Sequence, residues 1–215
     1  MLYKYKTLYE YGCQEVDIKR SKFIGHAKQI SSEEDAIKFI DDIRSRYNDA
    51  THNVYAYILG ERDEIQRYSD DGEPAGTAGI PVLNVIKNEG LKNVAVVVTR
   101  YFGGILLGAG GLIRAYVKGA KIGIDAAKIV EKILFKKMII IIDYTLLGTV
   151  QNDLIKNKYI IANIEYMDKV KLNVCVEYQN KKEFINYIIN LTNSRSIIKE
   201  GEEIYLYKKD DKYLV

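Results

Sequence analysis

Residues 96–121 read VVVTRYFGGILLGAGGLIRAYVKGAK and combine two unlike patterns around a glycine-rich centre. The run of β-branched residues at 94–99 predicts a buried strand. Apolar residues at helical spacing predict a helix over about 112–128. The segment between them holds five glycines, Gly103, Gly104, Gly108, Gly110 and Gly111. Glycine allows a positive φ and a close backbone approach, so this loop is either a tight strand-to-helix connection or a binding loop.

The predicted helix carries Arg114, Lys118 and Lys121 at spacings of four and three residues, which places them on one stripe. Arg100 ends the preceding strand. Backbone N–H groups at a helix start attract anions, so loop and stripe form a candidate site for RNA phosphates or an acidic protein patch. The alternative is an ordinary solvated face. The opposite, core-facing side is expected to hold the remaining apolar residues, Ile113, Tyr116, Val117, Ala120 and Ile124.

A second loop, SDDGEPAGTAG at 69–79, brings together Asp70, Asp71 and Glu73. Three carboxylates this close could hold a divalent cation or supply acid and base groups. They could equally cap the helix predicted at 78–88, or form ion pairs with Arg100 and Arg114; this structural role is favoured. Thr77 is expected to cap that helix.

His52, in DATHN at 49–53, completes this candidate polar site as either a base or a hydrogen-bonded structural residue, the latter being favoured. His26, in the middle of a predicted strand, carries less signal. Cys13 and Cys175 stand far apart with no partner motif, so no disulfide framework or zinc ribbon is expected. No nucleophile motif and no metal-ligand spacing stand out, so no catalytic residue, metal or cofactor is assigned.

The two halves of the chain differ in composition. Of the 16 glycines, only Gly148 and Gly201 lie beyond residue 130. Earlier strands are expected at 15–18, 23–29, 54–60 and 65–68, with a helix capped by Ser31-Ser32 between the second and third. Later elements follow the order strand 132–143, helix 146–158, strand 160–166, strand 170–178, helix 181–192 and strand 197–207. This βαββαβ order predicts a ferredoxin-like domain. We therefore expect two α+β domains, 1–130 and 131–215.

Global composition excludes several classes of protein. The 215 residues contain 32 Lys plus Arg and 29 Asp plus Glu, a net charge of +3 that alone does not indicate a nucleic-acid binder. The N-terminus is too polar for a secretory signal, and the longest apolar run, MIIII at 138–142, is far short of a membrane span. A cytoplasmic protein without membrane contact is expected.

Four motifs resemble the IMPACT family and its bacterial YigZ branch. They are RSKFIGHA at 20–27, DATHNVYAY at 49–57, SDDGEPAGTAGIPVL at 69–83 and VVVTRYFGGILLGAGGLIRAY at 96–116. The resemblance implies a two-layer α/β sandwich of the ribosomal protein S-five second-domain type for the first domain. It implies a second domain similar to a terminal domain of translation elongation factor G, although that half shows no sharp motif.

The resemblance also implies a link to translation. Eukaryotic relatives restrain the starvation-sensing initiation-factor kinase through its ribosome-bound coactivator, but they use an additional N-terminal domain that this chain lacks, and bacteria lack that kinase. The first hypothesis is therefore a non-enzymatic, translation-linked regulatory protein that binds RNA or the ribosome. Arg100, the five glycines and the Arg114/Lys118/Lys121 stripe would form its contact surface.

Two alternatives come from other functional classes. One is an enzyme acting on a phosphorylated small molecule, with the phosphate on the glycine loop and Asp70, Asp71, Glu73 and His52 as the chemical groups. The other is a protein-interaction module that exposes Tyr101, Phe102, Ile105, Leu106 and Leu107, although continuity with the buried strand favours a core position for these side chains. The sequence leaves oligomeric state, domain motion and the identity of the RNA or substrate open.

Overall fold

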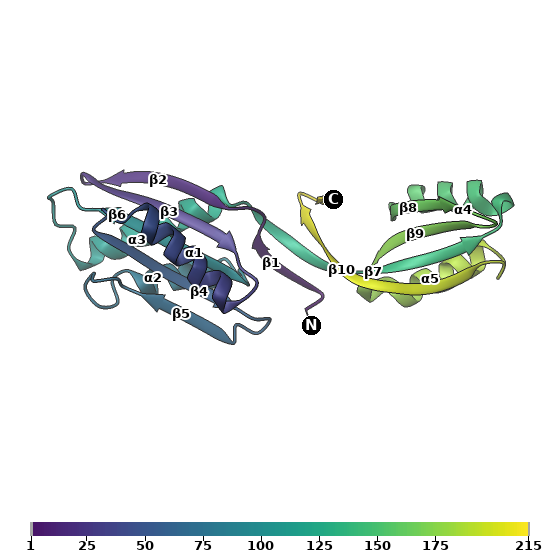
Figure 1. Cartoon of the computed structure of the whole chain (residues 1–215), viewed down its shortest axis with the longest axis horizontal. Coiled ribbons are helices and arrows are strands. Elements are labelled where there is room, and N and C mark those ends of the chain that lie inside the picture. The colour runs from purple at the N-terminus through teal and green to yellow at the C-terminus, as the bar shows by residue number, and fades with distance from the viewer. Residues whose placement is uncertain (1, 215) are drawn as a thin grey trace. The chain divides into compact units, whose positions relative to one another are not determined.

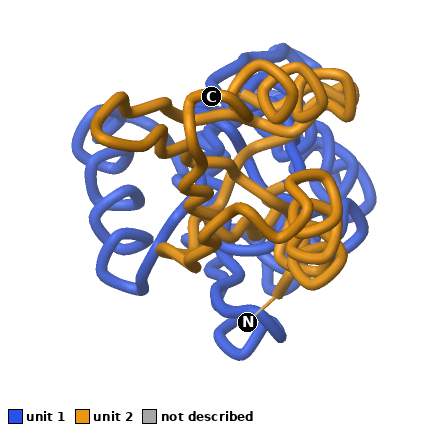
Figure 2. The backbone as a smooth tube through the Cα atoms, turned by 90° about the vertical axis from the view of Figure 1, so that its right-hand side faces the viewer, with its two compact units in different colours: residues 1, 5–131 blue, residues 2–4, 132–215 orange. Residues whose placement is uncertain are grey.

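The computed structural model describes residues 2–214, which form two compact units (Figure 2). Unit 1 is Tyr5–Glu131, and unit 2 combines Leu2–Lys4 with the chain from residue 132 onward. Each unit has its own hydrophobic core. No helix in the described chain has the length and apolarity needed to cross a membrane.

Residues 2–126 form six strands and three helices. In chain order they are β1 (Lys4–Leu8), β2 (Gly12–Ile18), β3 (Ser21–Gln29), α1 (Glu33–Arg46), β4 (His52–Leu59), β5 (Ile65–Ser69), α2 (Gly79–Asn88), β6 (Val94–Tyr101) and α3 (Ala109–Ala126). Five of the strands make an antiparallel sheet in the order β2-β3-β6-β4-β5 (Figure 1). The glycine-rich segment thus leaves the central strand, and α3 follows it.

The central strand β6 is buried on both faces. Val94, Val96 and Val98 belong to the core that α2 and α3 cover, whereas Ala95 and Val97 pack with α1 on the opposite face. Because both faces are covered, β6 reads as a continuous apolar run instead of an alternating pattern. The α+β class is confirmed, and α1 adds a layer to the sandwich of sheet, α2 and α3.

Glycines allow α3 to lie directly against β3. A Cβ atom on Gly25 of β3 would lie 1.9 Å from the carbonyl oxygen of Gly119 in α3. One on Gly123 would lie 2.7 Å from the carbonyl carbon of Gly25. Both clashes are with backbone, which cannot rotate away. These glycines therefore set the helix at a distance from the sheet that no other residue permits.

Unit 2 has the ferredoxin-like order. Its elements are β7 (Ile129–Ile142, whose first residues belong to unit 1), α4 (Tyr144–Lys156), β8 (Ile160–Tyr166), β9 (Val170–Glu177), the short 3₁₀ helix η1 (Tyr178–Asn180), α5 (Lys181–Leu191), β10 (Ile197–Lys209) and β11 (Lys212–Leu214). The strand order is β11-β10-β7-β9-β8. Both helices pack on one face, where Val150 and Phe184 meet Met138 and Leu172. The predicted βαββαβ order is confirmed, while β1 and β11 were not predicted.

Candidate functional site

The glycine loop connects β6 to α3 by turning the chain sharply out of the sheet. Gly104 and Gly108 have φ values of 78° and 70°, in the region that favours glycine. Gly103 packs so tightly that a Cβ atom would lie 2.0 Å from the carbonyl oxygen of Arg20. Gly110 and Gly111 fall in the first turn of α3. The glycines singled out in the sequence therefore have two roles. Gly103 allows tight packing where the loop begins, and Gly110 and Gly111 leave the start of α3 open.

A buried ion pair lies beneath this loop. The Arg100 guanidinium donates from Nη1 to Glu73 Oε1 at 2.5 Å, and the Tyr116 hydroxyl donates to the same oxygen at 2.7 Å. The three side chains come from β6, the acidic loop and α3. Burial, followed by the hydrogen bond to Glu73, raises the pKa of Tyr116 far above its ordinary value. The hydroxyl therefore stays protonated and remains a donor to the carboxylate.

The structure assigns separate structural bonds to the other two carboxylates of the acidic loop. Asp70 accepts from the backbone N–H groups of Gly76, Ala78 and Gly79, and so caps α2. Thr77, expected as that cap, instead donates its hydroxyl to the Pro74 carbonyl, because α2 begins two residues later at Gly79. The Thr77 prediction was wrong, and the alternative that the acidic loop caps the helix holds for Asp70.

Asp71 holds the acidic loop against β4 and α1. Its carboxylate accepts from the Asn53 backbone N–H at 2.6 Å and from Arg44 at 3.0 Å. His52 Nδ1 lies 2.7 Å from the Asp71 carbonyl oxygen, and His52 Nε2 lies 3.8 Å from Glu73 Oε1. The predicted supporting residues His52, Asp70, Asp71 and Glu73 are thus neighbours. Among the described residues, no group of three or more His, Cys, Asp or Glu side chains is arranged to hold a metal ion.

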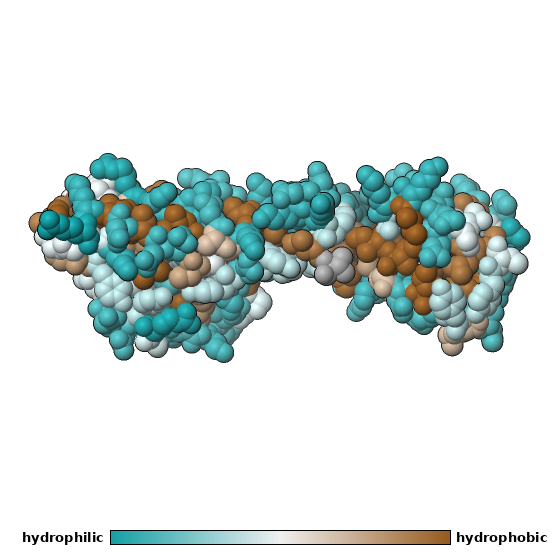
Figure 3. Space-filling view, turned by 90° about the horizontal axis from the view of Figure 1, so that it is seen from above, coloured by the Kyte–Doolittle hydropathy of each residue, from teal (hydrophilic) through white to brown (hydrophobic). Residues whose placement is uncertain are grey.

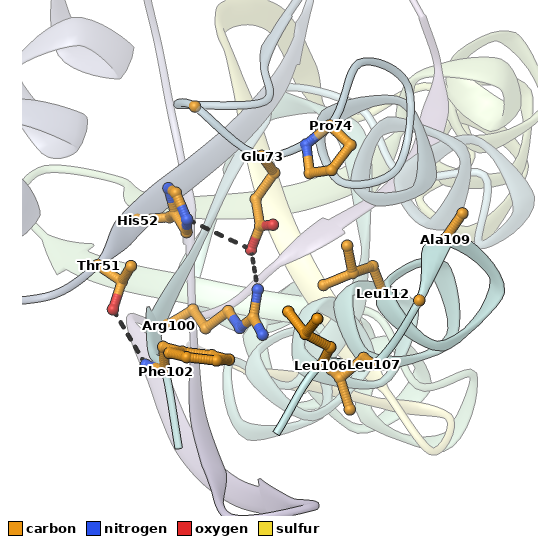
Figure 4. A pocket seen from close by; sticks show the side chains of 12 residues that line it. Thr51, His52, Glu73, Pro74, Arg100, Phe102, Leu106, Leu107, Ala109 and Leu112 are labelled. Carbon is orange, nitrogen blue, oxygen red and sulfur yellow. Dashed lines mark hydrogen bonds and ion pairs between the residues drawn. The ribbon is translucent and has the colours of Figure 1, made fainter. Parts of the chain in front are cut away.

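A pocket of about 460 Å³ opens beside the ion pair (Figure 4). His52, Glu73 and Arg100 lie on one side of it, and Leu106, Leu107 and Leu112 lie on the other. Phe102, Gly108 and Ala109 also contribute to the wall, so the pocket reaches the first residue of α3. It is an apolar recess with one polar side, a common composition for a ligand site.

The apolar residues of the glycine loop are more exposed than the sequence indicated. Leu106 is 85% exposed, Phe102 45% and Ile105 38%. Tyr101 and Leu107 are half-buried, and Tyr101 donates its hydroxyl to Asp49. The core position favoured for these side chains is therefore wrong for Phe102, Ile105 and Leu106, because the chain leaves the sheet after Tyr101. Figure 3 shows hydrophobic residues at the surface among hydrophilic ones.

The basic stripe of α3 has two exposed members. Arg114 and Lys118 are exposed and form no ion pair with the described residues. Lys121 instead pairs with Glu89 at 2.8 Å and Asp125 at 3.1 Å. Ile113 and Val117, expected in the core, are 40% and 39% exposed. The exposed face of α3 therefore mixes cationic and apolar side chains.

No side chain among residues 2–214 caps the N-terminus of α3. Gly108 occupies the N-cap position with no side-chain hydrogen bond, and the first turn contains no acidic residue. A Cβ atom on Gly110 would lie 3.6 Å from Nη1 of Arg114, so this guanidinium lies over the first turn. Partial positive charge and a full cation therefore meet at one end of the helix.

The sequence did not identify Tyr116 as a site residue, and it named Phe102 only in the alternative of an exposed protein contact. Tyr116 was assigned to the core, which its zero exposure confirms, but its hydroxyl bonds to Glu73 from 43 positions away. The usable signal was a phenol on an otherwise aliphatic helix face, since a buried hydroxyl needs a partner. Phe102 gave no such signal, because its exposure depends on where the loop turns.

Comparisons with known proteins identify both halves of the chain. The Impact N-terminal domain matches residues 19–124, and a domain of unknown function, DUF1949, matches residues 140–195. IMPACT family member YvyE of Bacillus subtilis (strain 168) is 45% identical over 208 residues, which cover 97% of this chain and 96% of that protein. The chain belongs to the IMPACT family.

Two further similarities agree with this membership. IMPACT family member YigZ of Escherichia coli (strain K12) is 44% identical over 105 residues, covering 48% of this chain and 52% of that one. A solved structure, titled as that of a hypothetical protein, superposes with a TM-score of 0.60 at 28% identity. The superposition covers 94% of this chain and 99% of the other. Family membership therefore rests on nearly the whole chain.

Proposed function

We propose that this IMPACT family member is a non-enzymatic, translation-linked regulatory protein that binds RNA on the ribosome through the glycine loop and α3. The observation that carries the proposal is the uncapped N-terminus of α3 beneath the Arg114 guanidinium. The link to translation comes from the family resemblance of the four sequence motifs. Together they favour RNA phosphates as the occupant of the helix start.

The backbone and the side chains at this helix start supply donors of the kind that phosphate accepts. The N–H groups of Ala109, Gly110 and Gly111 precede the first intrahelical bond, which runs from the Leu112 N–H to the Gly108 carbonyl. Arg114 adds a guanidinium, and Lys118 adds an ammonium one turn further along α3. Such contacts position a nucleic-acid backbone without selecting its sequence.

The enzyme alternative has less support in the geometry. Asp70 caps a helix, Asp71 holds two structural donors, and Glu73 accepts from Arg100 and Tyr116. A general base needs a lone pair directed at substrate, and a metal site needs several converging oxygens. The bonds of these carboxylates favour a structural role for the acidic loop.

A protein partner is the second candidate. Five exposed apolar side chains lie on the loop and on α3, namely Phe102, Ile105, Leu106, Ile113 and Val117. Exposed apolar clusters often mark contact surfaces. A protein on the ribosome could cover these side chains, but Arg114 and Lys118 between them would then have to face acidic groups.

Retention of single-stranded RNA on a filter, measured over a salt series, tests the RNA contact. The variant Arg114→Glu/Lys118→Glu removes two phosphate contacts, so the slope of log affinity against log salt should fall by about 1.4. The matched control Lys38→Glu/Lys87→Glu makes the same charge change at exposed sites on α1 and α2 of the same unit. Equal retention by wild type and the α3 variant would refute the proposal.

A further inference from the structure

We propose that the pocket beside Arg100 and Glu73 takes a keto nucleobase, uracil or guanine, from the single-stranded RNA, while that nucleotide's phosphate lies at the first turn of α3. This inference rests on the proposed function and adds base recognition to it. It names the ligand of the pocket, which the phosphate contacts alone do not specify.

The Arg100 guanidinium has more donors than the protein satisfies. A guanidinium carries five N–H groups. Nη1 donates to Glu73, Nε is sealed from solvent without an acceptor, and Nη2 has no acceptor among the described residues and lies on the pocket side in Figure 4. The side chain is only 6% exposed and lines the pocket. Nη2 is therefore the donor that a ligand can reach, and the geometry favours a ligand that brings an acceptor oxygen to this side of the pocket.

Glu73 makes a neutral, planar ligand a better match than an anion. Its carboxylate balances the charge of Arg100, so this polar side has no net positive charge to attract a phosphate. Figure 4 shows the second carboxylate oxygen turned toward Leu112 and away from His52. The pair therefore offers a donor group beside an acceptor. Uracil and guanine carry a C=O beside an N–H, the complementary order, whereas the Watson–Crick edge of adenine has no carbonyl.

The remaining walls suit a base in size and chemistry. The volume of about 460 Å³ admits a nucleotide-sized group. Leu106, Leu107 and Leu112 supply apolar contacts, and so does the half-exposed ring of Phe102 at the rim, over which the Arg100 guanidinium lies 5.5 Å from the ring centroid. Ala109 lines the pocket and is also the first residue of α3, so a base in the pocket would have its phosphate at the uncapped helix start.

Fluorescence anisotropy with oligouridylate and oligoadenylate of equal length tests this inference. Wild type should bind oligouridylate about tenfold more tightly, the scale of discrimination that one bidentate hydrogen-bonded base edge provides. Pro74→Phe fills the pocket from an exposed position on the acidic loop, outside the glycine loop and α3, and should reduce this ratio to about one while leaving salt-sensitive binding of both oligomers. Ser45→Phe, which adds the same side chain at an exposed site on α1, should keep the tenfold ratio.

The other outcomes separate this inference from the proposed function. A preference for uridine that persists in Pro74→Phe, or equal binding of the two oligomers by wild type, would overturn the base pocket and leave the phosphate contact standing. If wild type binds neither oligomer at low salt, the proposed function is overturned as well. Uridine monophosphate that binds as tightly as the oligomer would identify a free nucleotide as the occupant and refute the assignment to RNA.

Discussion

Unit 1 buries an ion pair, whereas unit 2 keeps its ion pairs at the surface. Arg100 and Glu73 have side chains that are 6% and 3% exposed. In unit 2, Lys137 pairs with Glu202, whose side chain is 67% exposed. A buried pair contributes little net stability relative to apolar packing, although breaking it is costly. A buried pair beside a pocket is what the proposed recognition role of unit 1 calls for, whereas the ion pairs of unit 2 lie around an apolar core.

The glycines show the same contrast. Fourteen of the 16 lie before residue 131, and only Gly148 and Gly201 lie after it. In unit 1 they form the glycine loop and bring α3 against β3, whereas Gly148 of α4 has open space around it. The difference predicts that substitutions at the closely packed glycines of unit 1 are costly, whereas unit 2 accepts one at Gly148.

The largest expected effect is at Gly25. Gly25→Ala adds a Cβ atom 1.9 Å from the backbone oxygen of Gly119, and neither β3 nor α3 can move without opening the core. We expect a loss of at least about 4 kcal/mol in the free energy of unfolding of unit 1. Urea unfolding followed by circular dichroism measures it. A midpoint equal to that of wild type would show that the close helix–sheet contact is not required.

The buried ion pair gives the next largest effect. Glu73→Ala leaves the Arg100 guanidinium buried without its carboxylate and should lower the free energy of unfolding by about 3–5 kcal/mol. Replacing both partners, in Glu73→Met/Arg100→Met, should recover most of that loss because no unpaired charge remains. Chemical denaturation of wild type and both variants compares them. A double variant as unstable as the single one would contradict the interpretation.

His26 should make the stability of unit 1 depend on pH. Burial, followed by the charge of Arg46, lowers the pKa of His26 to about 4, and its Nδ1 lies 2.9 Å from the Tyr11 hydroxyl. The unfolded chain takes up this proton near pH 6.5, before the folded one does. Stability should therefore fall as pH drops from about 6.5 toward 4, by up to about 3 kcal/mol.

Urea unfolding at a series of pH values, repeated with His26→Gln, isolates this contribution. Both histidines of the chain lie in unit 1, so unit 2 lacks this contribution. In His26→Gln, the free energy of unfolding should no longer change with pH at values above the range in which the carboxyl groups titrate. Identical pH profiles for wild type and His26→Gln would exclude His26 as the cause.

The smallest expected effect is a gain in unit 2. Gly148 is an exposed residue inside α4, and a Cβ atom there meets nothing within 4 Å. Gly148→Ala should raise the free energy of unfolding of unit 2 by about 0.5–1 kcal/mol, because alanine loses less backbone entropy in a helix. Thermal unfolding checks the sign. A decrease in stability would mean that this face of α4 makes a contact that the added methyl group disrupts.

The secondary-structure elements and the fold class of each domain could be predicted because the periodicity of apolar residues is a local property of the sequence. The buried strand at β6, the serine-capped α1 and the βαββαβ order of unit 2 all follow from short windows of sequence. The Ser32 hydroxyl, for example, accepts from the Asp35 N–H. Each element bounded by strong turn signals was found close to its observed ends.

The site could be predicted only in part, because it depends on contacts between distant residues. Glu73 lies 27 positions from Arg100 and 43 from Tyr116, so their convergence exists only once α2 and α3 pack on the sheet. Ile113 and Val117 fit an amphipathic pattern, yet the fold covers the face that carries Leu112, Ala115 and Tyr116. A pattern states that a side chain is apolar but not whether a neighbour covers it.

Co-sedimentation of the full chain with ribosomes at low and high salt examines the proposed role as a whole. Wild type and the Lys38→Glu/Lys87→Glu control should sediment with ribosomes at low salt and be released at high salt, since the proposed contact is to phosphates. Arg114→Glu/Lys118→Glu should stay in the supernatant at both. Sedimentation of this α3 variant to the same extent as wild type at low salt would contradict RNA binding through the glycine loop and α3.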